Sequence, residues 1–289
     1  MKVLITGNLG FVGRYFSRYL NDRGNTVYGV DIACDDGSDA RDFFRTDATH
    51  FDLVIHLAAV VGGRIQIEGD PLSVAVDLSI DAELFQWAIR TKPTQLVYFS
   101  SSAAYPIELQ TLANRRTLIE DDIDLKAIRN PDMSYGWAKL TGEMLADFAR
   151  AEGIKTYVFR PFSGYGTDQD LNYPFPSFID RGLNRLDPFV IWGDGSACRD
   201  FIHIEDIINA VFAALKADID FPVNLCTGRP TSFTELAQMV SKSADYAPIF
   251  RYILDAPRGV EYRVGSPDKM ASFYVPKISL EEGIDRALM

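Results

Sequence analysis

The chain has 289 residues with 29 basic and 40 acidic side chains, which gives a formal net charge of −11. No lysine- or arginine-rich block is present, which excludes an electrostatic nucleic-acid binder. No apolar run approaches the ~20 residues that a membrane-spanning helix needs, so no membrane partner is expected.

The cysteines and the N-terminus indicate a compartment. Cys34, Cys198 and Cys226 are scattered without CxxC spacing, a pattern typical of reduced thiols rather than of a metal site or a disulfide framework. The first residues enter an apolar run at once, so no signal peptide is expected. These features predict a cytoplasmic protein without a metal.

Strands and helices alternate through the first half of the chain. The predicted strands are Val3–Thr6, Thr26–Asp31, Leu53–Leu57, Gln95–Ser100 and Thr156–Arg160, with a shorter one near Phe43–Arg45. The predicted helices are Phe11–Arg23, Pro71–Arg90 and Ser134–Glu152. The strands are continuously apolar, as expected when helices cover both faces of a sheet. The pattern predicts an α/β fold, a doubly wound parallel sheet of the Rossmann type.

The character changes after Pro161, where prolines and aromatic residues cluster and the strands become short. A helix at Ile204–Ala217, a strand at Val223–Cys226 and a helix at Thr234–Ser243 are predicted. We expect a dinucleotide-binding domain of residues 1–165 plus 200–228, and a small C-terminal substrate-binding lobe of residues 166–199 plus 229–289. A cleft between them would hold the second ligand.

The first strand leads into a helix through a turn with spaced glycines. Gly7 permits the tight turn, Gly10 lets the backbone approach phosphates, and Gly13 lets helix and strand pack closely. Phe11 and Val12 open the helix, whose N-terminus suits the pyrophosphate of a dinucleotide. Three spaced glycines also occur in turns that bind nothing, but here the strand and the helix flank them.

Two acids are candidates for the adenosine end of such a cofactor. Asp31 ends the second strand, where a carboxylate accepts hydrogen bonds from ribose hydroxyls and repels a 2′-phosphate, which favours NAD over NADP. An exposed strand-end acid or a helix cap is the alternative. Asp47 follows the predicted short strand and is a candidate for the adenine amino group, although a turn aspartate explains it nearly as well.

Tyr135 and Lys139 are four residues apart and so share one face of the predicted helix. The reference pKa of tyrosine is ~10, and an adjacent ammonium together with a positive nicotinamide ring would lower it. Ser100, Ser101 and Ser102 end a predicted strand, at the edge of the sheet where ligands bind. A hydroxyl there can bond a substrate oxygen, although serine is also common in loops.

These motifs occur in an order that resembles the extended short-chain dehydrogenase/reductases of the nucleotide-sugar epimerase/dehydratase family. The matching segments are Thr6-Gly7-x-x-Gly10-x-x-Gly13, His56-Leu57-Ala58-Ala59, Ser100-Ser101-Ser102-Ala103-Ala104-Tyr105, Tyr135-x-x-x-Lys139, Arg160-Pro161, Gly193-Asp194-Gly195-x-x-x-Arg199-Asp200-Phe201-Ile202-His203 and Leu280-Glu281-Glu282-Gly283. They cover nearly the whole chain.

The resemblance implies a role for each matching residue. Tyr135 would be the base and Lys139 its partner, with Ser101 completing the triad and Ser102 a close second. Ala58 and Ala59 would line the cofactor, NAD. Three arginines are implied on the substrate side: Arg199 as the clamp on the diphosphate of a nucleotide sugar, and Arg258 or Arg263 as a second arm or as a surface residue.

The resemblance also implies a homodimer, formed through the helices Ser73–Arg90 and Ser134–Arg150. These helices could instead use their apolar faces only to pack on the sheet. The aromatic segment Tyr173–Phe178 is expected either to contact the sugar and its base or to be core.

Departures from the family pattern indicate which of the family's reactions this chain is expected to catalyse. Dehydratases of this family carry an Asp-Glu pair where Ser102 and Ala103 stand, and related decarboxylases keep a glutamate at Ala103. The segment Ala59–Gly63 is similar to GDP-fucose synthase and GDP-mannose 3,5-epimerase, which use a cysteine at Ala103. Alanine at position 103 has no group that can transfer a proton, so the sequence disfavours dehydration, decarboxylation and epimerisation at carbons 3 and 5. Asp77 stands where the family usually has an asparagine. A buried acid there would alter proton handling, and the alternative is that Asp77 simply faces solvent.

The remaining chemistry needs only the triad and a hydride carrier. It favours C4 epimerisation of a nucleotide sugar through a 4-keto intermediate, with NAD regenerated in each turnover. A reductase of nucleotide-4-keto sugars that consumes NAD(P)H uses the same triad. A non-catalytic dinucleotide sensor is a third interpretation, although such proteins commonly lose the tyrosine or the lysine.

Overall fold

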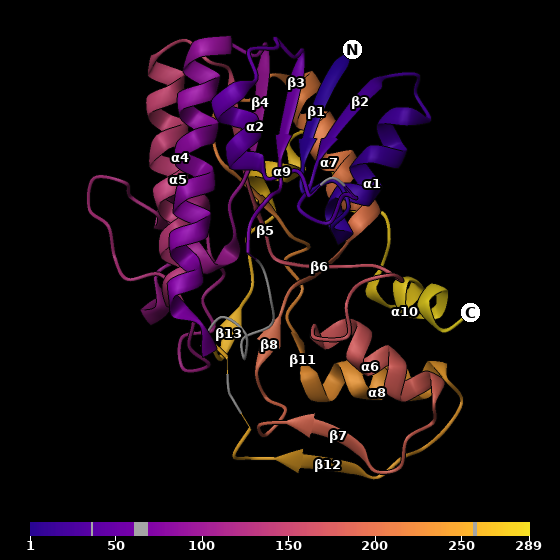
Figure 1. The fold of residues 1–289 in the computed structure, drawn as a ribbon. Helices are drawn as coiled ribbons and strands as arrows, with labels where there is room; N and C mark the ends of the chain where they lie inside the picture. Colours follow the sequence, from indigo (N-terminus) through magenta and orange to yellow (C-terminus); the bar gives the residue numbers. More distant parts are fainter. Residues whose placement is uncertain (36, 61–68, 257–258) are drawn as a thin grey trace.

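The computed structural model describes residues 1–35, 37–60, 69–256 and 259–289. Its centre is a six-stranded sheet in the order β10-β5-β4-β3-β1-β2, in which every neighbouring pair is parallel (Figure 1). The strands are β1 (Lys2–Thr6), β2 (Thr26–Val30), β3 (Leu53–His56), β4 (Gln95–Phe99), β5 (Thr156–Pro161) and β10 (Val223–Leu225). The predicted fold class, an α/β doubly wound parallel sheet, is confirmed.

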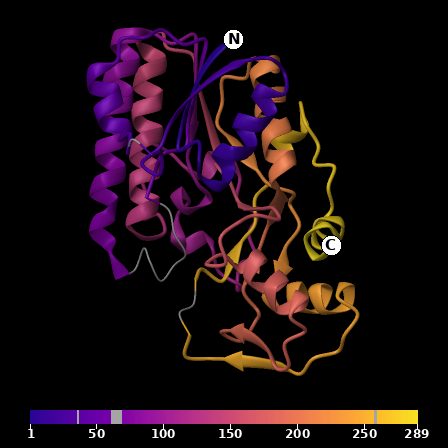
Figure 2. The same cartoon turned by 45° about the vertical axis from the view of Figure 1, so that its right-hand side comes forward.

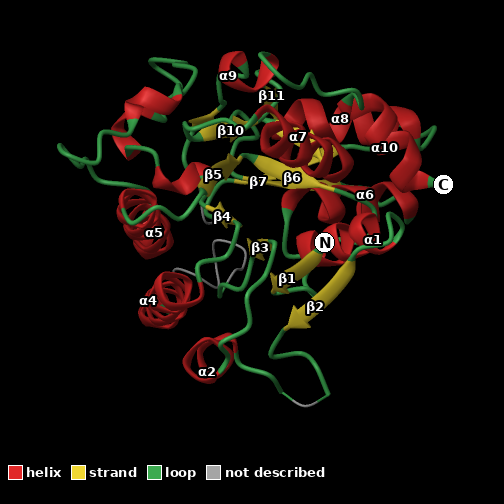
Figure 3. Cartoon of the chain, turned by 90° about the horizontal axis from the view of Figure 1, so that it is seen from above, coloured by secondary structure: helices red, strands yellow, loops and turns green. Residues whose placement is uncertain are grey.

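Helices cover both faces of the sheet (Figure 3). One face carries α1 (Phe11–Asn21) and α7 (Ile204–Ala217), and the other carries α2 (Ala40–Thr46), α4 (Val74–Thr91) and α5 (Met133–Ala151). Successive strand residues point to opposite faces. Val3 and Ile5 therefore join the core under α1 and α7, whereas Leu4 joins the core under α4 and α5. This explains why the strands are continuously apolar.

A C-terminal lobe lies beyond the carboxyl ends of the strands (Figures 1 and 2). Its helices are α6 (Pro174–Leu183), α8 (Phe233–Ser243) and α10 (Leu280–Leu288), which pack around an apolar core of their own. Its strands form a parallel pair, β7 (Phe189–Trp192) with β12 (Phe250–Ile253), and a small sheet of β11 (Thr231–Ser232), β8 (Cys198–Arg199) and β13 (Tyr262–Arg263).

Short elements connect the sheet to the lobe. β6 (Ser163–Tyr165) pairs with β9 (Phe201–His203), and α9 (Asp268–Ala271) packs on β10. The 3-10 turns are η1 (Pro71–Ser73), η2 (Ser102–Ala104), η3 (Ile107–Leu109) and η4 (Glu120–Asp122). The other predicted elements end within two residues of the observed ones, except that the helix predicted from Pro71 opens with η1.

Two segments differ from the prediction. The strand predicted near Phe43–Arg45 is wrong, because these residues belong to α2. Ala40 and Phe44 are buried four residues apart on one face, which is a helical period. The proline-rich segment after Tyr173 forms α6, because Pro174 occupies the first turn, where a missing N–H costs nothing.

Two absences hold for the described ranges. Among those residues, no helix is both long enough and apolar enough to cross a membrane. Within the same ranges, no group of histidine, cysteine, aspartate and glutamate side chains could hold a metal ion.

Asp200 ties three segments together at the carboxyl edge of the sheet. Its buried carboxylate accepts hydrogen bonds from the Thr227 amide (2.8 Å) and hydroxyl (2.7 Å), from the Gly228 amide (2.9 Å) and from the Gly265 amide (3.3 Å). Burial raises the pKa of Asp200 in spite of these donors. The acid therefore joins the loop after β10 to the segment after β13.

We predict that Asp200→Ala lowers the free energy of unfolding by about 3 kcal/mol, because the buried Gly265 amide and the half-buried amides of Thr227 and Gly228 lose their acceptor. Urea unfolding followed by circular dichroism measures the loss. Asp220→Ala, at an exposed position after α7, is the control and should change stability by less than about 0.5 kcal/mol. An equal effect of the two substitutions would contradict the role of Asp200.

Candidate active site

A tight turn joins β1 to α1, and its three glycines meet different constraints. Gly7 has φ of +72°, and a Cβ there would lie 2.9 Å from the Ala58 nitrogen. A Cβ on Gly13 would lie 2.1 Å from the Gly7 oxygen, so only glycine fits. Gly10 is the least crowded, since the nearest atom to its Cβ would be 3.3 Å away. Its bare backbone is open to a ligand.

The N-terminus of α1 fits an anion. Gly10 caps the helix without a side-chain hydrogen bond, and no acid lies in the first turn. The first amides of the helix, including those of Phe11 and Val12, therefore have no side-chain partner from the cap, and the helix dipole favours negative charge there. Ala58 and Ala59 follow β3 beside this turn. These residues fit the pyrophosphate of a dinucleotide.

Asp31 follows β2 and holds the glycine turn. Its carboxylate accepts from the Leu9 amide (2.8 Å) and from the Ala33 amide (2.9 Å). A carboxylate has about four acceptor positions, so two more are available to ribose hydroxyls. The structural role is therefore observed, and the free acceptor positions leave the predicted binding role open to the same carboxylate.

Asp47 follows a helix rather than the predicted short strand. It ends α2, and its carboxylate accepts from the Thr49 amide (2.7 Å) and hydroxyl (3.0 Å). Asp52, five residues later, accepts from the Lys2 amide (2.7 Å) at the amino edge of the sheet. The acid at the amino end of α2 is Asp39, which caps the first turn by accepting from the Arg41 amide (2.8 Å).

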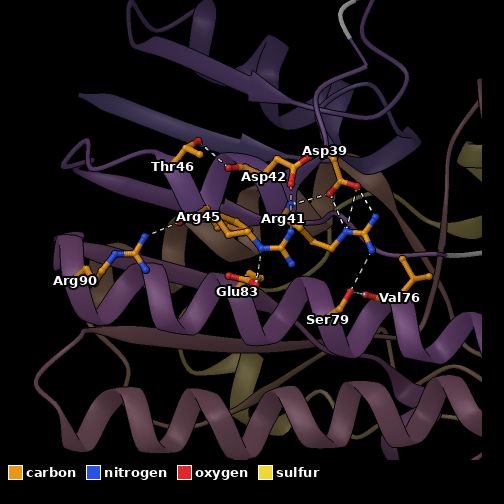
Figure 4. Close-up of polar contacts among 10 residues, drawn as sticks. Asp39, Arg41, Asp42, Arg45, Thr46, Val76, Ser79, Glu83 and Arg90 are labelled. Atoms are coloured by element: carbon orange, nitrogen blue, oxygen red, sulfur yellow. Dashed lines mark hydrogen bonds and ion pairs between the residues drawn. The ribbon is translucent and has the colours of Figure 1, made fainter.

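Sequence reasoning missed Asp39 because the following segment was interpreted as a strand. An aspartate directly before a helical period is an N-cap signal that could have found it. Arg41 bonds the Asp39 carboxylate and holds its pKa below the usual range. Polar contacts then fix α2 on α4 (Figure 4). They join Arg41 to Ser79 (3.4 Å), Arg45 to Glu83 (2.8 Å) and Arg90 to the Phe44 carbonyl (2.6 Å).

The start of α5 presses against η2 and brings the catalytic candidates together. The Asp132 amide donates to the Ala103 carbonyl (2.9 Å), and a Cβ on Gly136 would lie 2.4 Å from that oxygen. As a result, the Ser101 hydroxyl lies close enough to the Tyr135 phenol to lower its pKa. The Lys139 ammonium lies 5.7 Å from the centre of the Tyr135 ring, one helical turn away. The predicted shared face of the two residues is confirmed.

The three serines have different surroundings. The Ser101 hydroxyl lies near the Tyr135 phenol and accepts from the Ala103 amide (3.1 Å). The Ser100 hydroxyl donates to Glu143, which is paired with Arg160 (2.6 Å) in the core. Ser102 is buried in η2. The structure therefore brings Ser101, rather than Ser102, to the tyrosine.

The pKa of Tyr135 differs from expectation. Burial raises the pKa of Tyr135. This increase outweighs the effects of the Lys139 ammonium and the Ser101 hydroxyl, which both lower the pKa. Asp77 and Asp81 raise it further. The Lys139 ammonium lowers the pKa of Tyr135 as expected, but the increase caused by burial is larger.

Buried acids surround Lys139. Burial alone would lower the pKa of the ammonium, but Tyr135, Asp81 and Asp77 raise it above its ordinary value, so the lysine is charged. Asp77 is buried, and one of its oxygens accepts from the Val60 amide (2.5 Å). Burial raises the pKa of Asp77 to about 6. Asp77 therefore titrates near neutral pH and does not face solvent.

Asp81 is a second acid that sequence reasoning missed. It accepts from the Tyr98 hydroxyl (2.6 Å) and contacts His56 Nε2 (3.1 Å), while His56 Nδ1 contacts the Thr6 hydroxyl (2.8 Å). Burial lowers the pKa of His56, so the ring is neutral near pH 7. The sequence did contain a signal for Asp81, because it lies four residues after Asp77 and so shares one face of the same helix with it.

The arginines on the substrate side lie on neighbouring strands. Arg199 and Arg263 are partners in the parallel register of β8 and β13. Arg199 donates to the Val260 carbonyl (2.8 Å) and lies over the Phe233 ring. Arg263 bonds Asp132 (2.5 Å), which links the lobe to the start of α5. Arg258 lies outside the described residues.

The aromatic segment before α6 divides into two parts. Tyr173 is half-buried and close enough to Tyr135 for the two charges to interact, and burial raises its pKa to about 12. Phe175 and Phe178 belong to the core of the lobe. Of this segment, Tyr173 is thus the residue that reaches the candidate site.

Comparison with known proteins agrees with this architecture. Residues 3–225 match the model of the NAD dependent epimerase/dehydratase family. The chain belongs to this family and is an enzyme of the NAD-dependent nucleotide-sugar epimerase and reductase type; an NAD(P) dinucleotide is the cofactor typical of it.

Individual relatives carry different activities. A dTDP-4-dehydro-6-deoxy-D-allose reductase from Streptomyces sp is 29% identical over 82% of this chain and 79% of its own length. GDP-L-fucose synthase 1 from Arabidopsis thaliana is 24% identical over 99% of this chain and 91% of its own. The structure is similar to the Thermus thermophilus UDP-glucose 4-epimerase in complex with NAD, with a TM-score of 0.83, 23% identity and coverage of 100% and 98%.

We predict that Asp77→Asn stabilises the protein near pH 8. The carboxyl binds its proton more tightly in the folded state (pKa about 6) than at its ordinary value of 3.8. Stability is therefore lost as the pH rises through this interval and stays lost above it. The gain in the free energy of unfolding should be about 1 to 2 kcal/mol near pH 8 and should fall to about half of that near pH 5.

Urea unfolding at the two pH values measures this difference. Glu83→Gln is the matched control, because Glu83 lies on the same helix but pairs with Arg45 away from the site. It should produce no such pH-dependent gain. A gain for Asp77→Asn that is the same at both pH values would contradict the titration of Asp77.

Proposed function

We propose that this protein is an NAD-dependent nucleotide-sugar epimerase that inverts C4 through a 4-keto intermediate. The observation that carries the proposal is the group of Tyr135, Lys139 and Ser101, together with a buried alanine at position 103. Alanine has no proton to give or take. Tyr135 therefore offers base chemistry at one hydroxyl, and position 103 supplies neither the acid for dehydration nor the thiol for enolisation.

The chain's own residues would act as follows. Tyr135, as the phenolate, accepts the proton of the C4 hydroxyl, and Lys139 stabilises the phenolate. Ser101 bonds both the phenol and the C4 oxygen, which keeps that oxygen in line with the base. Bound NAD would supply a carrier that accepts the C4 hydride and returns it to the other face of the sugar. Tyr135 then returns the proton to oxygen.

Specificity for NAD over NADP follows from Asp31. Its carboxylate lies beside the glycine turn, where the 2′-phosphate of NADP would meet like charge. The lobe of residues 166–199 plus 229–289 would hold the nucleotide sugar. Arg199 and Arg263 are adjacent cations that suit its diphosphate, since planar guanidinium groups bond phosphate oxygens in pairs.

A reductase of nucleotide-4-keto sugars is the second candidate. It is favoured by the 29% identity to a reductase of that class. Both activities need the same Tyr135 and Lys139, so the site geometry fits either one. They differ in whether reduced cofactor is consumed in proportion to product.

The test is a panel of UDP-, GDP-, TDP- and CDP-sugars incubated with the protein and a trace of NAD. We expect one sugar to convert to its C4 epimer without net change in the absorbance of reduced cofactor. Tyr135→Phe should lower the rate roughly 10³-fold, because it removes the base. Tyr252→Phe, an exposed tyrosine of β12, should leave the rate unchanged.

Two results would overturn the proposal. Full activity in Tyr135→Phe would exclude Tyr135 as the base. Conversion that occurs only with a 4-keto sugar, and consumes one reduced cofactor per product, would establish the reductase.

We also propose a homodimer through α4 and α5. These helices lie side by side on one face of the sheet (Figure 3). They expose large apolar side chains, with Trp137 44% exposed, Phe148 61% exposed and Ile89 46% exposed. Exposed apolar residues gathered on neighbouring helices are typical of a protein interface.

Phe148→Glu should convert the dimer to a monomer, because it buries a charge in the proposed interface. Sedimentation velocity measures the mass. Ile249→Glu, at a 72% exposed position of the lobe, is the control and should leave the mass unchanged. A wild-type monomer, or a Phe148→Glu dimer, would contradict this interface.

A further inference from the structure

Two carboxylates face one buried ammonium beside the catalytic tyrosine. Asp77 and Asp81 are one turn apart on α4, and both are buried, at 3% and 2% exposure. Lys139 and Tyr135 face them from α5, and each of the two acids interacts electrostatically with both. The balance of charge in this cluster determines what the cluster can bind.

Asp81 is already satisfied by its neighbours. It accepts from the Tyr98 hydroxyl of β4 and contacts the His56 ring of β3. Burial keeps His56 neutral and raises the pKa of Tyr98, so neither adds a charge near neutral pH. Together with the Lys139 ammonium, Asp81 makes a neutral pair.

Asp77 is the surplus charge. Among the described residues, the Val60 amide is the donor that reaches its carboxylate, and η1 before it contributes no ionisable side chain. An asparagine oxygen would accept from Val60 equally well, so this hydrogen bond does not require an acid. Counted over the described residues, an ionised Asp77 leaves the cluster with one net negative charge next to Tyr135.

We propose that Asp77 is a counter-charge for the oxidised nicotinamide ring, so that the site holds NAD⁺ more tightly than NADH. The inference rests on the proposed function, in which Tyr135 and Lys139 stand at the nicotinamide end of the cofactor. The oxidised ring carries one positive charge and the reduced ring carries none. A buried negative charge nearby therefore favours the oxidised form.

The bias suits an enzyme that starts each turnover from NAD⁺. A site that disfavours NADH returns the hydride to the 4-keto sugar rather than keeping it. A reductase, in contrast, must bind NADH well before it meets its substrate. Asp77 acts through charge and is a positioning residue, not a catalytic one.

The test is the ratio of the Kd values for NAD⁺ and NADH, without any sugar. NADH is titrated by its fluorescence, and NAD⁺ by competition. Near pH 8, Asp77→Asn should weaken NAD⁺ about tenfold relative to NADH. Glu83→Gln, the control on the same helix, should leave the ratio unchanged. In the wild type the preference for NAD⁺ should shrink as the pH falls from about 8 to about 5, and in Asp77→Asn it should not.

Three results overturn the inference. Equal weakening of both dinucleotides by Asp77→Asn would mean a structural role only. A wild-type ratio of the two Kd values that does not change with pH would also mean that Asp77 has only a structural role. Binding of neither dinucleotide by the wild type would remove the proposed function as well. The expected ratios with no turnover of any sugar would leave the role of Asp77 intact and overturn the epimerase alone.

Discussion

The buried ammonium of Lys139 is the constraint on which the site depends. A charge removed from water is costly unless opposite charges compensate it. Here the compensation comes from α4, through Asp77 and Asp81, and the same ammonium favours ionisation of Tyr135. The helix that carries the tyrosine and the helix that carries the acids must therefore pack side by side, and the apolar core beneath them holds them so.

The lobe is coupled to this site by polar contacts rather than by its own core. Arg263 of β13 pairs with Asp132 at the start of α5, three residues before the tyrosine. Asp200 holds the segments after β10 and β13 together. A change in the position of the lobe would thus reach Tyr135 through a few hydrogen bonds, which would couple the proposed substrate binding to the proposed base.

Local sequence patterns predicted much of the fold and of the candidate site. The parts that the sequence did not predict depend largely on long-range contacts. The glycine turn and the Tyr135–Lys139 pair were found because each is set by spacing within one strand-turn-helix or one helix. The segment at Phe43–Arg45 was misassigned because a seven-residue helix shows barely two turns of periodicity. The contacts of Asp81 with Tyr98 and of Arg263 with Asp132 join residues far apart in sequence, which no local pattern encodes.

The central claim is that the hydride leaves C4 and returns to it within one site. The direct measurement is NMR of the epimerised sugar formed in deuterated water with a trace of NAD. The account predicts a new C4 epimer that carries no solvent deuterium, because the hydride never exchanges and Tyr135 moves only the hydroxyl proton. Deuterium at C3 or C5 would mean enolisation, and the argument from Ala103 would be wrong.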